Sequence, residues 1–437
     1  MGRVTRRGFL CNAAAGLGTA AGIGATGVAA AAGRGRASTS DGPSDRVNVG
    51  VIGCRNRGSA VAKAMLESGE FSVAMLCDCD SFGRMAGQST VRKFAYERHP
   101  EPEVVADFRQ VLDSAAVDAV VVATPDHWHA LLCSLALDAG KHVYLEKPAS
   151  YNIEDGKAMV AAQGRHPDLT VLVGTQQRSG RHFEEAREFV RAGGLGTVGF
   201  CRASQVNVCD EVPVVADADP PPGLDYEMWV GPGPMRPYNA RRVHYNWRYM
   251  RDYGTGDLGN WGAHWLDIVL WYLDLGYPTA VSAAGGQFVV HDAKEWPDTQ
   301  TVLCEYPGLT VLWEQRLWAR GAGTAPCELH GEKGTLQISR GKWVFRPREG
   351  EPEEHEGSEM DEAHVRHFAA CVRGDARPVA GIEDGHKTAV LCHLGNISTV
   401  VGRKVAFDGE NQTIVGDAEA QALEGRAYRE PWQISPA

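Results

Sequence analysis

The sequence predicts an α/β protein in which a doubly wound parallel sheet is followed by a second region rich in strands. Between residues 47 and 173, short apolar runs alternate with segments of helical spacing, as in a parallel sheet with crossover helices. Residues 119–123 are almost entirely apolar, as expected of a strand that is covered on both faces. After residue 200, strand patterns follow one another with turn glycines such as Gly331 and Gly334 between them.

The first domain is predicted over residues 46–175 and the second over residues 176–405. In the first, strands are expected at 47–52, 71–77, 119–123, 142–145 and 169–173, and helices at 59–68, 108–114, 129–139 and 153–163. In the second, strands are expected at 200–208, 280–290, 300–306, 309–317, 327–331, 335–339 and 342–346, with helices at 361–371 and 383–401. Residues 406–437 are predicted to be a C-terminal tail, in which residues 417–437 wrap a neighbouring subunit or are loosely held.

The first 32 residues have the pattern of a twin-arginine signal peptide. Arg6 and Arg7 precede a weakly apolar stretch rich in Gly and Ala, and residues 29–31 are alanines that suit a processing peptidase. The many glycines argue against a membrane anchor. Residues 33–45 are predicted to be a linker. The expected partner is the twin-arginine export machinery, and the expected location is the periplasm or another compartment reached by that route.

Composition and charge fit a globular protein with two domains. The chain has 437 residues, of which 43% are hydrophobic, so each domain can bury a core. The net charge of −11 argues against a nucleic acid or an anionic membrane as partner. The 11 cysteines have no metal-type spacing, so no metal site is predicted, and buried thiols are favoured over disulfides.

A glycine turn follows the first predicted strand and resembles the fingerprint that binds a dinucleotide pyrophosphate. The fingerprint has glycines at Gly53, at position 55 and at Gly58, but position 55 is Arg55. The Arg55 side chain either caps a phosphate or lies in solvent and weakens binding. With Asn56 and Arg57, this turn is predicted to bind the cofactor.

Asp78 follows the second predicted strand, 20 positions after Gly58. A carboxylate there can accept hydrogen bonds from the adenine ribose diol and would repel a 2′-phosphate, which favours NAD over NADP. Asp80 adds negative charge, whereas Arg84 opposes it. The alternative is that Asp78 is only a turn residue.

The loop after residues 119–123 lies at the edge of the sheet where ligands bind. Thr124 and Pro125 are predicted to set its turn and to contact the cofactor. His127 and His129 are also predicted to lie at the cofactor, or alternatively to cap or pack against the next helix. A zinc site made by the two histidines would have no cysteine or acidic companion nearby and is only weakly indicated.

Two further polar segments complete the pattern. Glu146 and Lys147 end a predicted strand before a proline and are predicted to contact the cofactor. Asn260 and His264 are four residues apart, so they share one face of a helix. This order of motifs is typical of an enzyme that binds NAD and transfers a hydride. Together these segments resemble the Gfo/Idh/MocA oxidoreductases, the family of glucose-fructose oxidoreductase and inositol dehydrogenase, over residues 46–400.

The resemblance implies a Rossmann domain followed by an α/β domain with a large, mostly antiparallel open sheet. One face of that sheet often serves oligomer formation, so a homo-oligomer, dimer or tetramer, is expected. The family usually has an aspartate and a histidine four apart, completed by the lysine of Glu-Lys-Pro. Here the aspartate position is Asn260, which can neither carry a negative charge nor accept a proton.

Five further residues are predicted to bind a sugar, glycoside or cyclitol. Gln176 and Arg178 follow a strand end and can contact substrate hydroxyls. His244, Tyr245 and Trp247 combine aromatic surface with polar atoms, as a polyol site requires, although such a segment can also be an oligomer contact.

Catalysis is assigned to Lys147, His264 and Asn260. Oxidation of a carbinol requires a base for the hydroxyl proton, and His264 is the favoured base. Lys147 is the favoured cation that polarises the oxygen, but the two roles can be exchanged because burial lowers a lysine pKa. Asn260 is expected to position a substrate hydroxyl or the histidine.

Two other functions stay open. One is an NAD-dependent glycoside hydrolase that oxidises, eliminates, adds water and returns the hydride, a cycle that suits an exported protein because it needs no external cofactor. Family members of that hydrolytic type often lack the lysine of Glu-Lys-Pro, so the resemblance and the presence of Lys147 favour net oxidoreduction. The other is a non-catalytic sugar-binding or NAD-binding protein, which Arg55 and Asn260 keep open.

Overall fold

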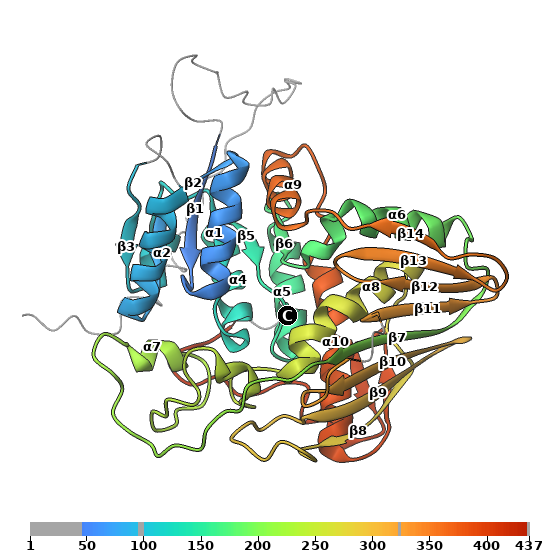
Figure 1. Ribbon diagram of the computed structural model, residues 1–437. Helices are drawn as coiled ribbons and strands as arrows, with labels where there is room; N and C mark the ends of the chain where they lie inside the picture. Colours follow the sequence, from blue (N-terminus) through green and yellow to red (C-terminus); the bar gives the residue numbers. More distant parts are fainter. Residues whose placement is uncertain (1–45, 95–99, 322–324, 435–437) are drawn as a thin grey trace, which may run out of the picture. The chain divides into compact units, whose positions relative to one another are not determined.

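The computed structural model describes residues 46–94, 100–321 and 325–434 of the chain. The predicted signal peptide and linker, residues 1–45, lie outside the described residues. The described part contains a parallel sheet, blue and cyan in Figure 1, and a larger sheet coloured mostly green to orange. Within these ranges, no helix combines the length and the apolar character needed to cross a membrane.

The first sheet has six parallel strands in the order β3-β2-β1-β4-β5-β6. Its strands are β1 Val47–Ile52, β2 Phe71–Cys77, β3 Glu103–Val105, β4 Ala119–Val122, β5 His142–Leu145 and β6 Val171–Val173. The connecting helices are α1 Asn56–Ser68, α2 Ser81–Phe94, α3 Phe108–Asp113, α4 His129–Asp138 and α5 Ile153–Arg165. The predicted doubly wound parallel sheet is confirmed.

The turn between β1 and α1 is so tight that it requires glycine at both position 53 and position 58. Gly53 has a φ of +88°, which favours glycine. A Cβ on Gly58 would lie 1.8 Å from the Gly53 carbonyl oxygen. The helix therefore starts directly against the strand end, and its first residues are placed at the carboxyl edge of the sheet.

The second sheet has ten strands in the order β14-β13-β12-β11-β7-β10-β9-β8-β15-β16. They are β7 Val198–Val206, β8 Ala280–Gly286, β9 Thr299–Tyr306, β10 Leu309–Arg316, β11 Cys327–Gly331, β12 Gly334–Ile338, β13 Lys342–Pro347, β14 Glu353–Glu356, β15 Val405–Asp408 and β16 Thr413–Val415. Only β7 and β10 pair in parallel, so the expected, mostly antiparallel sheet is confirmed.

Helices cover one face of the second sheet. Buried and half-buried residues alternate along β10, so one side of this strand contributes to the core and includes the fully buried Trp313. The helices packed in this region are α6 Arg181–Arg191, α8 Ala263–Leu273 and α10 Ile382–Val401, whereas α9 Asp361–Arg373 packs on α1. All cysteines in the described ranges are free thiols.

The expected C-terminal tail is wrong for the described residues. The predicted boundary at residue 405 falls inside β15, and β15 and β16 extend the second sheet. A short helix, α11 Ala418–Gln421, follows, and Trp432 then packs on Trp128 of the first domain with ring centroids 5.0 Å apart. Strands of three or four residues leave almost no periodic pattern, so the sequence did not reveal them.

A long connection from β7 to α8 crosses to the first domain and includes α7 Tyr226–Val230. It pairs with the end of β2 through a bridge between Asp80 and Leu224. A backbone hydrogen bond of 2.9 Å from Ser81 to Gly223 supports this bridge. The connection thereby brings residues 243–248 against the carboxyl edge of the parallel sheet.

Candidate functional site

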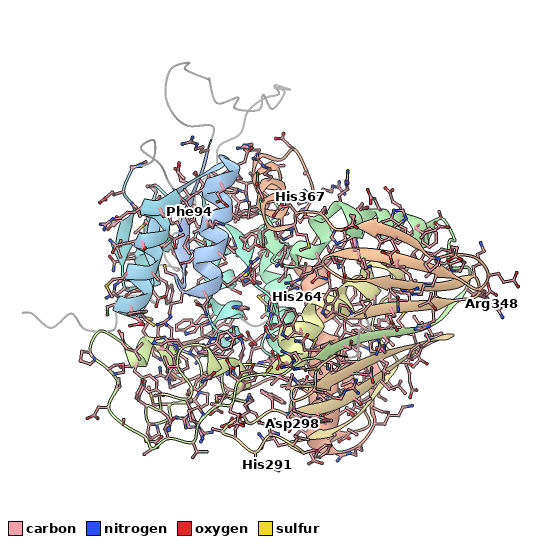
Figure 2. All side chains as sticks on the ribbon, in the orientation of Figure 1. Phe94, His264, His291, Asp298, Arg348 and His367 are labelled. Carbon is pink, nitrogen blue, oxygen red and sulfur yellow. The ribbon has the colours of Figure 1, made fainter. Side chains whose placement is uncertain are left out.

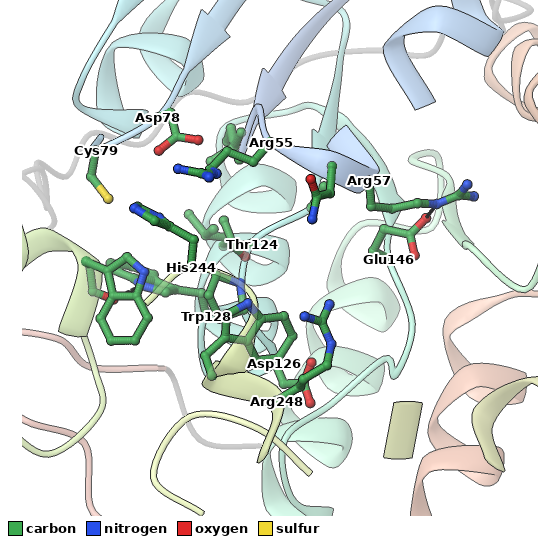
Figure 3. Close-up of a pocket in the computed structure, with 18 of the residues that line it drawn as sticks. Arg55, Arg57, Asp78, Cys79, Thr124, Asp126, Trp128, Glu146, His244 and Arg248 are labelled. Carbon is green, nitrogen blue, oxygen red and sulfur yellow. Dashed lines mark hydrogen bonds and ion pairs between the residues drawn. The ribbon is translucent and has the colours of Figure 1, made fainter. Parts of the chain in front are cut away.

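A cavity of about 470 Å³ lies at the carboxyl edge of the parallel sheet, and Figure 3 shows it in close-up. Its volume is in the range of sites for small molecules and cofactors. One wall comes from the turns after β1, β2, β4 and β5, and the other from residues 228–229, residues 243–248 and Asn260 of the second domain. This is where a doubly wound sheet binds its ligand.

The start of α1 forms one wall with Gly53, Arg55, Asn56 and Arg57. Arg55 is the N-cap residue, but its side chain makes no capping hydrogen bond, and the first turn contains no acidic residue. The first backbone N–H groups of the helix are therefore left to bind an anion, and the helix dipole favours negative charge there. Predicted Gly58 supports the turn from behind rather than lining the cavity.

Asp78 lies on the cavity wall at the end of β2, as its predicted role requires. Its carboxylate accepts hydrogen bonds from the backbone N–H of Cys54 at 2.9 Å and of Asp80 at 3.0 Å. Burial raises the pKa of Asp78, and these two donors oppose that effect. Each oxygen keeps a lone pair for a further donor, so a sugar diol can still bind.

Asp80 connects the two walls of the cavity. Its Oδ2 lies 3.2 Å from Arg55 Nη1 and 3.4 Å from His244 Nε2. The Arg55 guanidinium also lies over the Phe82 ring, 5.0 Å from its centroid. Arg55 thus lines the cavity and is held by a carboxylate instead of lying free in solvent, and its contact with a phosphate stays a prediction. We call Arg55, Asp80 and His244 the Asp80 end of the cavity.

In the loop after β4, Thr124 and Pro125 line the cavity, but the two histidines do not. Both rings of His127 and His129 bind backbone carbonyls instead: His127 contacts Tyr253 and Trp229, and His129 contacts Pro148 and Thr124. Burial lowers the pKa of His127 to about 3. Their prediction as cofactor contacts is therefore wrong, and the alternative of packing applies.

Glu146 follows β5, and its carboxylate is bound by Arg57. It accepts a 2.6 Å hydrogen bond from Arg57 Nε, and Arg57 Nη2 reaches Asp361 of α9 at 3.0 Å. Figure 3 shows the Arg57 and Glu146 side chains meeting at the edge of the cavity. The pair ties the start of α1 to the strand end that carries Lys147.

Lys147 is the polar group at the opposite end from Asp80. Its Nζ donates to the Asn260 side-chain oxygen at 2.8 Å and to the Asn260 backbone oxygen at 3.1 Å. Burial of the ammonium lowers the Lys147 pKa to about 8, while Glu146 opposes this effect. We call Lys147 and Asn260, which both line the cavity, its Lys147 end.

His264 lies at the start of α8, behind this end, and is labelled near the centre of Figure 2. It is buried, and its Nδ1 has no hydrogen-bond partner within the described ranges. Burial lowers the pKa of His264 well below its usual value, and Lys147 adds to the effect. The imidazole is therefore neutral, and it does not itself line the cavity.

Two predicted substrate contacts are wrong. Arg178 makes two 2.8 Å hydrogen bonds to the Asp267 carboxylate in the core, away from the cavity. Gln176 is buried and does not line the cavity either. The residues that follow β6 are covered by α8 and α10, so the side chains of Gln176 and Arg178 pack in the core.

The other three predicted substrate contacts line the cavity: His244, Tyr245 and Trp247. Arg248 lies with them, and its guanidinium carbon is 3.9 Å from the Tyr245 ring centroid and 4.5 Å from that of Trp247. Arg248 was not among the residues predicted from the sequence, although it follows Trp247 directly.

Where a metal is concerned, the described residues contain no group of three or more His, Cys, Asp or Glu placed to bind an ion. A dinucleotide fits the residues present. The uncapped start of α1 would bind the pyrophosphate, and Asp78 would bind ribose hydroxyls. Thr124 Oγ1, buried on the cavity wall without a partner in the described part, is free to bind a further polar group.

Comparison with known families gives two matches. Residues 47–193 match the model described as "Oxidoreductase family, NAD-binding Rossmann fold". Residues 212–297 and 356–434 match the C-terminal alpha/beta domain of the same oxidoreductase family. Together the two matches cover most of the chain, and they confirm the predicted oxidoreductase class and the predicted cofactor, NAD.

Similar proteins agree with this result at low identity. An uncharacterised oxidoreductase of Bacillus subtilis is 27% identical over 139 residues, 32% of this chain and only 37% of that protein. An uncharacterised oxidoreductase of Streptococcus pneumoniae is 23% identical over 72% of this chain and 80% of its own length. The crystal structure of aldose-aldose oxidoreductase from Caulobacter crescentus, complexed with glycerol, superposes with a TM-score of 0.65 at 20% identity, covering 83% of this chain and 100% of that one.

Proposed function

Because the chain belongs to the Gfo/Idh/MocA oxidoreductase family, we propose that it oxidises or reduces a hydroxyl-bearing carbon of a sugar, glycoside or cyclitol. NAD, when bound, supplies the hydride acceptor or donor. The observation that carries this proposal is the position of Lys147, whose desolvated amino group lies on the wall of the dinucleotide cavity at its junction with the second domain.

Lys147 is the better candidate for the proton transfer. A pKa of about 8 gives the amine a substantial neutral fraction near neutral pH, which a general base needs. His264 does not line the cavity, and its strongly lowered pKa makes it a poor base. The proposal thus exchanges the two roles favoured from the sequence: Lys147 takes the hydroxyl proton, and His264 is a neutral hydrogen-bonding group behind it.

The substrate class follows from the aromatic wall beside the Lys147 end. Tyr245, Trp247 and Arg248 present ring faces and N–H donors to the cavity, a combination that suits a ring carrying several hydroxyls. The Caulobacter crescentus structure was solved with glycerol, a polyol, which is in line with this class but belongs to that protein.

Product analysis tests the proposal. The purified protein is incubated with NAD and a panel of aldoses, aryl glycosides and cyclitols, and products are identified by mass spectrometry together with the absorbance of reduced nicotinamide. We expect a keto product and an equal amount of reduced cofactor. Free sugar with NAD unchanged would instead indicate the hydrolytic cycle, and bound cofactor without turnover of any compound would indicate a non-catalytic binding protein.

Export and self-association belong to the same proposal. The sequence of residues 1–32 supports transport by the twin-arginine route, and the open face of the second sheet is the candidate surface for a homo-oligomer. Fractionation of cells that express the full chain, followed by light scattering of the purified protein, tests both. Retention in the cytoplasm with Arg6 and Arg7 intact would contradict export, and a monomer at all concentrations would contradict the oligomer.

A further inference from the structure

Three polar side chains form a line that runs away from the cavity. Lys147 Nζ donates to Asn260 Oδ1 at 2.8 Å, and Asn260 Nδ2 donates to Asp257 Oδ1 at 3.2 Å. Asp257 and Asn260 lie one turn apart around the π-helical turn Leu258–Gly262, which precedes α8. The amide of Asn260 therefore sits between an ammonium group and a carboxyl group.

The direction of these hydrogen bonds is fixed by Asp257. An ionised carboxylate can only accept hydrogen bonds, so the NH₂ group of Asn260 must face Asp257. The carbonyl oxygen of the same amide must then face Lys147. In the reverse orientation two donors would meet at Lys147 and two acceptors at Asp257, so the line has one favourable arrangement.

Asp257 lowers the stability of the fold at this buried position, so a purely structural role does not explain it. It is 2% exposed, and in the described part of the chain its carboxylate makes no ion pair, although Arg248, Lys147 and Lys294 lie near enough to favour its charge. Its Oδ2 is buried and has no hydrogen-bond partner there either. Burial raises the pKa of Asp257, and its hydrogen bond from Asn260 opposes this effect. A buried carboxylate with a single side-chain donor costs stability unless its charge serves another group.

We propose that Asp257 is a positioning residue for the reaction, which fixes the Asn260 amide and through it supplies a negative charge to Lys147. Asn260 cannot carry that charge itself. The negative charge is on Asp257, which contacts Asn260 and not Lys147. Its effect reaches the Lys147 amine through the oriented dipole of the Asn260 amide. This inference rests on the proposed function only for its effect on turnover, because its effect on the Lys147 amine exists without substrate.

Several charged or titratable groups surround the Lys147–Asn260–Asp257 line. Those that face Lys147 are Glu146, Arg248, Asp126, Arg57 and His264, and those that face Asp257 are Arg248, Lys294, Cys209 and Tyr249. Glu146 is already bound by Arg57. Removal of the Asp257 charge takes one negative charge from the surroundings of Lys147, which disfavours the protonated amine, so the Lys147 pKa is expected to fall.

The first experiment measures the Lys147 titration directly. The protein is labelled with ¹³C-lysine, the Lys147 signal is assigned by its loss in Lys147→Arg, and its chemical shift is followed with pH by NMR. Asp257→Asn keeps an acceptor oxygen but removes the charge, and we expect the Lys147 pKa to fall by about 1 or more, as for the loss of one nearby opposite charge. Asp252→Asn is the matched control, because Asp252 pairs with Arg236 on the same connection and does not take part in the line.

A double variant separates charge from packing. Asp257→Asn combined with Asn260→Asp exchanges the two side chains and keeps one carboxylate, now in direct contact with Lys147, with the new amide able to donate to it. We expect a Lys147 pKa at or above that of the unmodified protein, and this variant carries the test if Asp257→Asn does not fold. A Lys147 titration that is unchanged in Asp257→Asn, or still lowered in the double variant, overturns the proposal.

Turnover gives the second readout. In the direction of alcohol oxidation, the acid limb of kcat against pH should move to lower pH in Asp257→Asn and return in the double variant, whereas the Kd for NAD stays unchanged. An unchanged acid limb together with weaker NAD binding would overturn a positioning role at Lys147. If the unmodified protein turns over no substrate while the NMR shifts occur as expected, the proposed function fails and the role of Asp257 stands.

Discussion

The two ends of the cavity use charge in opposite ways. At the Asp80 end, one carboxylate is paired with Arg55 at 3.2 Å, and the same carboxylate lies 3.4 Å from the His244 ring on the other wall, whose pKa is lowered by burial. At the Lys147 end, the amine contacts a neutral amide, and burial lowers its pKa to about 8. Paired charges join two segments, whereas a desolvated and incompletely paired amine is able to exchange a proton.

The ion pair beside Lys147 explains why the amine stays available. Glu146 precedes Lys147 in the chain and could have neutralised it, but Glu146 is engaged by Arg57 at 2.6 Å. Asn260 is the remaining side-chain acceptor within hydrogen-bonding distance of Nζ in the described structure, and it is uncharged. The difference between the two ends therefore depends on which partner each carboxylate has.

The largest effect is expected at Lys147. Lys147→Ala removes the proposed base, so kcat should fall by about 10²- to 10⁴-fold while NAD still binds, because general acid–base catalysis contributes that much. Lys147→Arg should be similarly impaired, since a guanidinium does not give up its proton at these pH values. Stopped-flow kinetics and fluorescence titration with NAD measure the two quantities.

Lys63→Ala is the matched control, since Lys63 lies on α1 and pairs with Glu67 at the surface. In the unmodified protein, alcohol oxidation should increase with pH through about 8, as Lys147 loses its proton. Substantial activity in Lys147→Ala would remove the contrast between the two ends of the cavity.

The second effect is on stability and concerns Arg178, which the sequence had assigned to the substrate. Arg178→Met leaves the Asp267 carboxylate, 2% exposed, without its main partner. Breaking a buried pair in this way should lower the free energy of unfolding by about 3–5 kcal/mol, measured by chemical denaturation. The kcat and KM of the folded fraction should be unchanged.

Arg181→Met, whose side chain is 82% exposed and pairs with Glu185, is the control and should be close to neutral. A raised KM at unchanged stability in Arg178→Met would restore Arg178 to the substrate site and would mean that the catalytic region extends beyond the described cavity.

The smallest effect is expected at the Asp80 end. His244→Ala removes one polar contact between the two walls. Because burial lowers the pKa of His244, this is a contact of a neutral imidazole with Asp80, worth about 1 kcal/mol, so NAD binding should weaken by about fivefold or less. The kcat at saturating NAD should stay the same. Calorimetric titration measures the change, with His291→Ala, on an exposed loop, as the control.

A loss of kcat in His244→Ala as large as that in Lys147→Ala would contradict the contrast, because the Asp80 end would then take part in catalysis as well as in cofactor binding. An NAD affinity equal to that of the His291→Ala control would show that the pair with Asp80 makes no measurable contribution.

The reach of the sequence analysis differs between the two histidine groups. Asn260 and His264 were placed near Lys147 on the strength of their helical spacing and the family pattern, and the structure brings Asn260 and Lys147 into direct contact. His127 and His129 follow a strand at the expected edge, yet both rings turn inward to backbone carbonyls. Nothing local distinguishes a histidine that faces a cavity from one that satisfies buried carbonyls, because the partners of the latter lie up to 126 positions away.

Asp257 shows the same limit from the other side. It is three residues before Asn260, but its contact with the amide depends on the π-helical turn between them, which no periodic pattern announces. Arg178 was misassigned because a strand end at the correct edge is a reasonable place for a ligand contact. Only the packing of α8, which presents Asp267, gave this arginine a different partner.

The sequence by itself determined the parallel sheet, the glycine turn at its edge and the order of the polar segments, because side-chain periodicity and turn preferences act over a few neighbouring residues. The tertiary structure alone decided which polar side chains line the cavity and which are buried in contacts within the core. Lys147 and Asn260 are 113 positions apart, and their contact exists only because the fold brings the π-helical turn before α8 to the end of β5. The charge that a lysine carries in such a place depends on burial, and burial is a property of the assembled fold.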